Sequence, residues 1–152
     1  MKRVVITGLG IVSSIGNNAE EVLASLKSGK SGITHSESFA EQGLKSNVWG
    51  KPDIEIKDHI DRKALRFMGD AAGYAYIAME QAISDAKLTE EQVSDFRTGI
   101  VAGSGGASSA NIVSSTDTLR SRGIRRVGPY AVPKTMSSTV SACLATPYKI
   151  KG

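Results

Sequence analysis

Nucleophilic chemistry in this sequence would have to use Cys143, its single cysteine, together with His35 and His59, its two histidines. A catalytic thiol needs a neighbouring base or a helix N-terminus that lowers its pKa. Cys143 instead falls late in a predicted helix among small residues, and both histidines lie in or beside a polar stretch. We therefore predict that Cys143 is a small buried hydrophobic residue, that both histidines are solvated, and that the chain holds no catalytic residue. One cysteine and two histidines are also too few soft ligands for a zinc site, so we expect no metal.

The segment Gly8-Leu9-Gly10 follows a β-branched run, as at the start of a dinucleotide-binding fingerprint. The fingerprint needs a small residue where Ser13 stands, and it needs an acid for the ribose, which residues 26–32 lack. We therefore favour a tight structural turn at Gly8 and Gly10, with a nucleotide site as the weaker alternative. No cofactor is expected.

A second glycine-rich stretch, residues 103–106, follows another predicted buried strand. Backbone without side chains lets another group approach closely. A phosphate-binding loop would continue with Lys and then Ser or Thr, which do not follow here. The stretch therefore indicates room for an apolar ligand or for another subunit.

The charge of the chain is moderately basic, with 19 Lys and Arg against 15 Asp and Glu, a net charge of +4 and a pI near 9.3. Much of the excess lies in two clusters, which suggests an acidic partner surface, although a solvated helix face is the alternative. Nucleic acid is disfavoured because the 3 Phe, 4 Tyr and 1 Trp are not interleaved with the basic residues. The clusters are Arg62, Lys63 and Arg66, and Arg120, Arg122, Arg125 and Arg126.

The elements that must position these residues follow from hydrophobic periodicity and from capping residues. Strands alternating with long helices favour an α/β layered fold with a largely parallel sheet. The expected elements are a buried strand at 3–7, a helix capped by Asn18 and ended by Gly29, a polar surface excursion at 30–60 with a strand-like 47–49, a helix at 61–86, a capped helix start at 88–91, a buried strand at 98–103, a helix at 110–122, and a helix from Pro133 to about Ala145.

The length of 152 residues and a hydrophobic content of 40% fit one folding unit or part of one. The sequence contains no run of 18 apolar residues, and its N-terminus runs into the first predicted strand rather than into a signal peptide. We therefore expect a cytoplasmic protein that does not enter a membrane.

Four segments, residues 3–17, 60–68, 102–106 and 140–147, match a known family in the same order along the chain. Over all 152 residues the sequence resembles the N-terminal part of the bacterial 3-oxoacyl-[acyl-carrier-protein] synthases, the beta-ketoacyl-ACP synthases of fatty-acid biosynthesis. Gly106 followed by Ala107, together with residues 48–50, favours type I over type II of this family.

The resemblance implies a thiolase-like layered α/β fold, present here only in its N-terminal part with an incomplete mixed or parallel sheet. It also implies a homodimer that condenses malonyl-carrier protein with an acyl thioester and releases carbon dioxide. In the family the nucleophilic cysteine, two histidines and a lysine come after the equivalent of Gly152. We therefore expect residues 1–152 to be inert alone, truncated before the nucleophile, and Cys143 to match the family's separate helix cysteine.

Charge clustering and the resemblance together predict which residues bind the partner and the acyl chain. Gly106 and Met136 are expected to line the acyl pocket, with a turn glycine and a core methionine as the alternatives. The other functional hypotheses are a non-catalytic module that binds carrier protein or acyl chains, and a nucleotide-binding oxidoreductase domain. The residues expected to bind acyl carrier protein are Arg62, Lys63, Arg66, Arg122 and Arg125.

Overall fold

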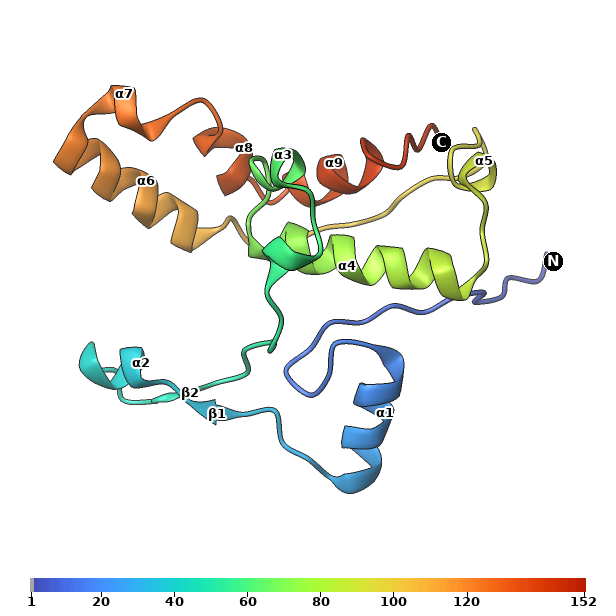
Figure 1. Ribbon diagram of the computed structural model, residues 1–152, viewed down its shortest axis with the longest axis horizontal. Helices are drawn as coiled ribbons and strands as arrows, with labels where there is room; N and C mark the ends of the chain where they lie inside the picture. Colours follow the sequence, from blue (N-terminus) through green and yellow to red (C-terminus); the bar gives the residue numbers. More distant parts are fainter. Residues whose placement is uncertain (1) are drawn as a thin grey trace.

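Two packed helices form the centre of the molecule, whose computed structural model describes residues 2–152. Helix α4 (Asp70–Asp85) lies along α9 (Thr139–Ala145), and the chain segments before α4 and after α9 pack around this pair (Figure 1). The buried apolar side chains of the central cluster come from these elements and from the approach to α4. They are Ile60, Met68, Ala72, Ile77, Val140, Cys143 and Leu144.

The single helix expected at 61–86 is wrong, because the chain forms two helices there. Helix α3 (Arg62–Leu65) is capped by Asp61, whose carboxylate accepts a hydrogen bond of 2.7 Å from the Lys63 N–H. The chain then leaves the helical conformation, and Gly69 supplies the extended N-cap of α4. The apolar periodicity continues across this break, so periodicity alone did not reveal it.

The helices expected after Asn18 and near residue 90 are confirmed. Helix α1 (Ala19–Ser28) starts at Asn18, whose side chain accepts from the Glu21 N–H at 2.9 Å, and ends at Gly29, which has a left-handed φ of 66°. Helix α5 (Glu90–Val93) starts at Thr89 with a capping box.

The polar excursion forms an arm that extends away from the central helices (Figure 1). Strand β1 (Thr34–His35) pairs antiparallel with β2 (Val48–Trp49), which confirms the strand-like character of residues 47–49. Helix α2 (Glu37–Glu41) lies between them, and its Phe39 ring packs edge-on against Trp49 with centroids 5.4 Å apart. A short 3-10 helix, η1 (Ile56–Asp58), then leads back to α4.

The two buried strands expected at 3–7 and 98–103 are not found. Val4 and Ile6 are each 91% exposed, and Val101 is fully exposed. A strand is completed by hydrogen bonds to a neighbouring strand, and within residues 2–152 neither segment has such a neighbour. The sheet of the described residues is therefore two-stranded and antiparallel, not largely parallel.

The tight turn expected at Gly8 and Gly10 is also wrong. Neither glycine has a positive φ, and the segment runs along α4 instead. A Cβ atom on Gly8 or Gly10 would collide with a backbone carbonyl of α4, at Ala82 and Ala78 respectively. The turn comes later, where the Ser13 N–H donates to the Gly16 carbonyl at 2.9 Å. The two glycines thus permit close packing on a helix.

Three helices form a lobe beside the central pair. Helix α6 (Ser109–Arg122) confirms the helix expected at 110–122, and α7 (Ile124–Val127) and α8 (Ala131–Thr135) follow it. The helix expected from Pro133 to Ala145 is wrong, because Met136 is extended between α8 and α9. The Pro133 carbonyl accepts a hydrogen bond from the Thr139 hydroxyl at 2.5 Å, where a continuous helix would use a backbone N–H.

Across residues 2–152, no helix combines the length and the apolar character needed to span a bilayer.

Candidate functional site

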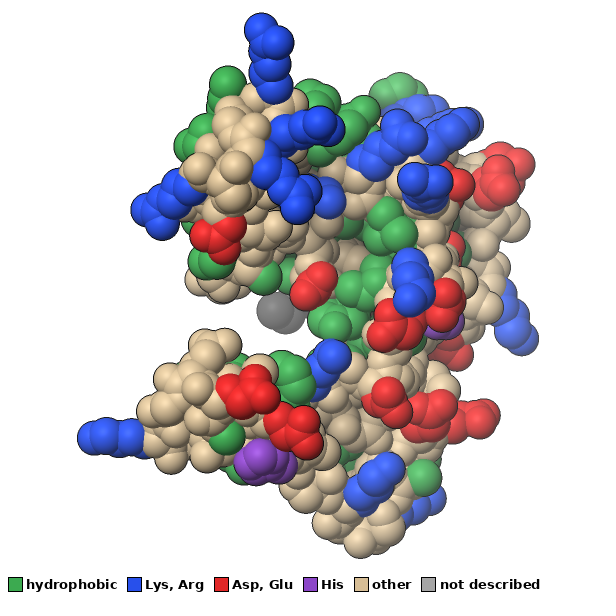
Figure 2. Space-filling view, turned by 60° about the vertical axis from the view of Figure 1, so that its left-hand side comes forward, with side chains coloured by type: hydrophobic (Ala, Val, Ile, Leu, Met, Phe, Trp, Pro, Cys, Tyr) green, Lys and Arg blue, Asp and Glu red, His purple; other side chains and the backbone are tan. Residues whose placement is uncertain are grey.

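The five basic residues expected to bind a partner lie on the surface. Figure 2 shows Lys and Arg side chains in two groups across the upper part of the molecule. Within residues 2–152 the one ion pair joins Lys57 to Glu55 at 3.3 Å, so all five cations stay available to an acidic partner. The exposed residues are Arg62 and Lys63 in α3, Arg66 directly after it, Arg122 at the end of α6 and Arg125 in α7.

An aromatic contact joins the two basic clusters, which are distant in sequence. The Phe67 ring, next to Arg66, packs edge-on against Tyr130, with centroids 5.0 Å apart and planes at 80°. The Arg66 guanidinium carbon lies 6.0 Å from the centroid of the same Tyr130 ring. Tyr130 leads from α7 into α8, so the chain that carries Arg125 is held beside the end of α3.

A cavity of about 210 Å³ brings together Gly106 and Met136, the two residues expected in the acyl pocket. It lies between the start of α4, the loop before α6 and the junction of α8 with α9. A Cβ atom on Gly106 would meet nothing within 4 Å, and its φ is not positive. Met136 is 50% exposed, which contradicts the alternative that it is a core methionine.

The five exposed cations form what we call the basic surface. The cavity and this basic surface are built from the same two chain segments. Gly69 and Lys134, both in the cavity wall, follow Arg66 and Tyr130 closely along the chain. The loop before α6 is tied to α8 by a hydrogen bond of 3.1 Å from the Ser108 N–H to the Thr135 carbonyl. The basic surface and the wall of the cavity are therefore directly adjacent along both chain segments.

The cysteine is buried, as predicted, with 8% of its surface exposed. The Cys143 thiol lies 3.9 Å from the Phe67 carbonyl and can donate a weak hydrogen bond to it. Burial raises the pKa of the thiol above its ordinary value of 9.0, the opposite of what a nucleophile needs. His35 and His59 are exposed, which confirms that they are solvated.

The alternative of a nucleotide site at Gly8 and Gly10 is disfavoured, because backbone N–H groups of this segment already donate to side chains of α4. The Leu9 N–H donates to an Asp85 carboxylate oxygen at 2.9 Å, and the Ile11 N–H donates to the Gln81 side chain at 3.0 Å. A phosphate would need such backbone groups free. This segment is attached to α4 instead.

Comparison with known families decides the relationship of the chain. All of residues 1–152 match the family model described as "Beta-ketoacyl synthase, N-terminal domain". The chain belongs to the beta-ketoacyl synthase family. Its whole length is 60% identical to 3-oxoacyl-[acyl-carrier-protein] synthase 1 of Haemophilus influenzae and 56% identical to that of Escherichia coli K12. The chain spans only 38% of the length of each of these relatives.

Other relatives agree with the type I character expected from Gly106 and Ala107. The identity to 3-oxoacyl-[acyl-carrier-protein] synthase 2 of Staphylococcus aureus is 33%, over 87% of this chain. The type 1 relatives are thus considerably more similar to this ketosynthase chain than this type 2 relative is.

Solved ketosynthase structures confirm the thiolase-like fold class. A beta-ketoacyl synthase from Burkholderia phymatum matches with a TM-score of 0.83 and 29% identity, covering 100% of this chain and 38% of that one. The ishigamide ketosynthase/chain length factor matches with a TM-score of 0.82 and 29% identity, covering 96% and 37%. The fold is therefore that of the N-terminal part of these ketosynthases.

Sequence reasoning missed two residues of this ketosynthase surface, Phe67 and Tyr130. Composition and spacing test the aromatic residues only as platforms for nucleic-acid bases, for which they are too few. Their contact joins residues far apart in sequence, and no local spacing rule predicts such a pair. The available signal was the position of Phe67 directly beside Arg66 and of Tyr130 close after Arg126.

Proposed function

We propose that residues 1–152 form the N-terminal part of a 3-oxoacyl-[acyl-carrier-protein] synthase of type I. In this proposal the whole protein elongates fatty acids by decarboxylative Claisen condensation of an acyl thioester with malonyl-carrier protein. The identity of 60% over the whole chain to a protein of that name carries the proposal. The chain covers 38% of that relative. In this proposal the nucleophile and its activating bases lie in later residues of the whole protein, as the family resemblance implies.

The chemistry of residues 2–152 supports this division of roles. Condensation needs an activated thiolate and donors to the developing oxyanion. The Cys143 thiol has a raised pKa and is enclosed between α9 and the segment before α4. We therefore assign to this part of the protein the binding of the carrier and one wall of the acyl pocket, and no bond-making step.

Turnover measurements test the overall proposal. The full-length protein is expected to condense acyl- with malonyl-carrier protein, whereas purified residues 1–152 show no product. A full-length protein that binds carrier protein without condensation would contradict the proposal and support a non-catalytic binding module. Turnover by residues 1–152 that is lost in Cys143→Ala would make Cys143 the nucleophile and overturn the assignment.

The exposed cations of α3, α6 and α7 support docking of the acidic carrier protein on the basic surface. Charge attraction of this kind speeds encounter and weakens with salt. In the full-length protein, Arg62→Glu combined with Lys63→Glu is expected to weaken carrier binding about tenfold at low salt, which is about 1.4 kcal/mol.

A matched control has the same change of net charge elsewhere. Lys27 and Lys30 are exposed at the end of α1, away from α3 (Figure 1). Reversing both is expected to leave carrier affinity within about twofold when both double variants are compared at about 0.1 M salt, because exposed charges beyond a Debye length of about 10 Å are then largely screened. Equal losses in both double variants would show a general charge effect rather than docking at α3.

The cavity at Gly106 and Met136 supports the acyl pocket. Gly106→Ile is expected to fill space that a long acyl chain uses, and each excluded methylene forfeits about 0.8 kcal/mol, or about fourfold in affinity. The measurement is kcat/KM against acyl chain length in the full-length protein. Selectivity should shift toward short chains.

Gly105→Ile is the control for the pocket experiment. Gly105 also has open space around its Cβ position, but among residues 2–152 it is not part of the wall of this cavity. It should leave chain-length selectivity unchanged. A uniform loss at all lengths in Gly106→Ile, or the same shift in both variants, would remove Gly106 from the pocket.

The resemblance also supports a homodimer in the cytoplasm, and we include both in the proposal. Val113 and Val132 are 58% and 67% exposed on α6 and α8, which leaves apolar surface for a second copy. Light scattering of the full-length protein measures the assembly directly. A monomer at micromolar concentration would contradict the proposed homodimer.

A further inference from the structure

Arg66 differs from the other basic residues of the surface in having an aromatic support. Its guanidinium carbon lies 6.0 Å from the centroid of the Tyr130 ring, within the range of a cation–π interaction. Within residues 2–152, Arg62, Lys63, Arg122 and Arg125 have neither an aromatic ring nor a carboxylate against their charged groups. Arg66 is thus the cation whose orientation the fold restricts.

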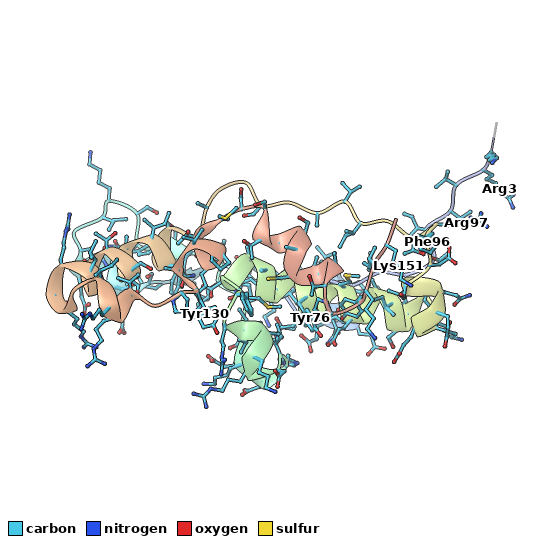
Figure 3. All side chains as sticks on the ribbon, turned by 90° about the horizontal axis from the view of Figure 1, so that it is seen from above. Arg3, Tyr76, Phe96, Arg97, Tyr130 and Lys151 are labelled. Carbon is cyan, nitrogen blue, oxygen red and sulfur yellow. The ribbon has the colours of Figure 1, made fainter. Side chains whose placement is uncertain are left out.

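Tyr130 is itself held at its ring and at its backbone. The ring packs edge-on against Phe67 at 5.0 Å, and the backbone carbonyl accepts a hydrogen bond of 3.2 Å from the Lys134 N–H in α8. Phe67 is held in turn, because its N–H donates to Ala64 at 3.1 Å and its carbonyl faces the buried Cys143 thiol. Figure 3 labels Tyr130 where the segment between α7 and α8 meets α3.

An orientated arginine has a physical advantage in binding a carboxylate or phosphate. A free arginine side chain loses rotamer freedom when it binds, and this loss opposes association. A guanidinium held against a ring has lost part of that freedom beforehand and keeps its five N–H donors directed outward along its plane. The ring does not consume these donors.

We propose that Tyr130 is a positioning residue, which holds the Arg66 guanidinium ready for an acidic group of the carrier protein. This inference rests on the proposed docking of carrier protein on the basic surface. It adds that the aromatic ring of Tyr130, which follows the second basic cluster along the chain, contributes to the affinity of the first cluster for the carrier protein. The phenol hydroxyl has no part in this arrangement, because the contact uses the face of the ring.

The test is a double-mutant cycle in the full-length protein, with acyl carrier protein as the probe at low salt. Tyr130→Leu is expected to weaken carrier binding about two- to fivefold, the range of an exposed cation–π contact. Tyr130→Phe keeps the ring and should bind as the unchanged protein does. In an Arg66→Gln background, Tyr130→Leu should cause no further loss, because the residue it supports is gone.

The outcomes separate the two proposals. Carrier affinity that is unchanged in Arg66→Gln would overturn docking at this surface. A loss in Arg66→Gln without a loss in Tyr130→Leu, or an equal loss from Tyr130→Leu in both backgrounds, would overturn the role of Tyr130 alone. A merely structural role would lower kcat and the melting temperature in both backgrounds, whereas positioning raises KM for the carrier and leaves kcat unchanged.

Discussion

Two apolar regions of this ketosynthase chain have similar side chains but opposite environments. Along α4 and α9, Ile77 and Leu144 are 5% and 4% exposed. In the extended segments 3–7 and 98–103, Val4 and Val101 are almost wholly exposed, while Ile100 and Ala102 are half-buried against the core. The helices satisfy their own backbone groups and bury their apolar faces against each other, whereas an extended segment needs neighbouring strands for both purposes. Composition alone therefore does not decide which apolar residues are buried.

The largest expected effect tests the helical region. Leu144→Ala removes a side chain from the contact of α9 with α4 and is expected to cost about 2–5 kcal/mol of the free energy of unfolding. The same substitution at Leu26, which is 65% exposed on α1, should stay within about 0.5 kcal/mol. Urea unfolding of both variants gives the comparison. Equal losses would show that α4 and α9 are not the core.

The next effect tests the extended region. Val101→Ala should change the stability of residues 1–152 by no more than about 0.5 kcal/mol, since the side chain is exposed. In the full-length protein, where we propose that further strands cover this segment, the same change should cost about 1.6 kcal/mol for two buried methyl groups. An equal and small effect in both proteins would contradict the proposed covering of residues 98–103.

The smallest effect tests an element that depends only on local residues. Asn18→Ala removes the cap of α1 and is expected to cost about 1 kcal/mol. Because the cap bonds to Glu21, three residues away, the loss should be the same in residues 1–152 and in the full-length protein. A loss confined to the full-length protein would mean that α1 is not formed in the shorter chain.

The contrast between elements that depend on nearby residues and segments that depend on distant ones also explains what the sequence predicts well. Asn18, Gly29 and Thr89 act within a few residues, and the helix ends that they predict are confirmed. The strands at 3–7 and 98–103 depend on residues far along the chain, so their local pattern could not reveal whether a partner strand lies beside them. The helix breaks before Gly69 and at Met136 were hidden by apolar periodicity that continues through them.

The candidate site follows a similar rule. The exposure of Arg62 and Arg125 could be predicted, because charged side chains are rarely buried without partners. The open space at Gly106 could also be inferred from its missing side chain. The contact between Phe67 and Tyr130 could not, since it depends on how the α6 to α8 lobe lies beside α3.

The exposed segment at residues 3–7 has a consequence for the synthesis of the protein in the cell. The ribosome makes residues 3–7 before α4 and α9, and at about 5–20 residues per second the roughly 250 further residues of the relatives take about 12–50 s. During that time α4 and α9 can already pack, while Val4, Val5 and Ile6 present an uncovered edge to which a second nascent chain can add a strand. We expect residues 3–7 to be the part of residues 1–152 that most needs a chaperone.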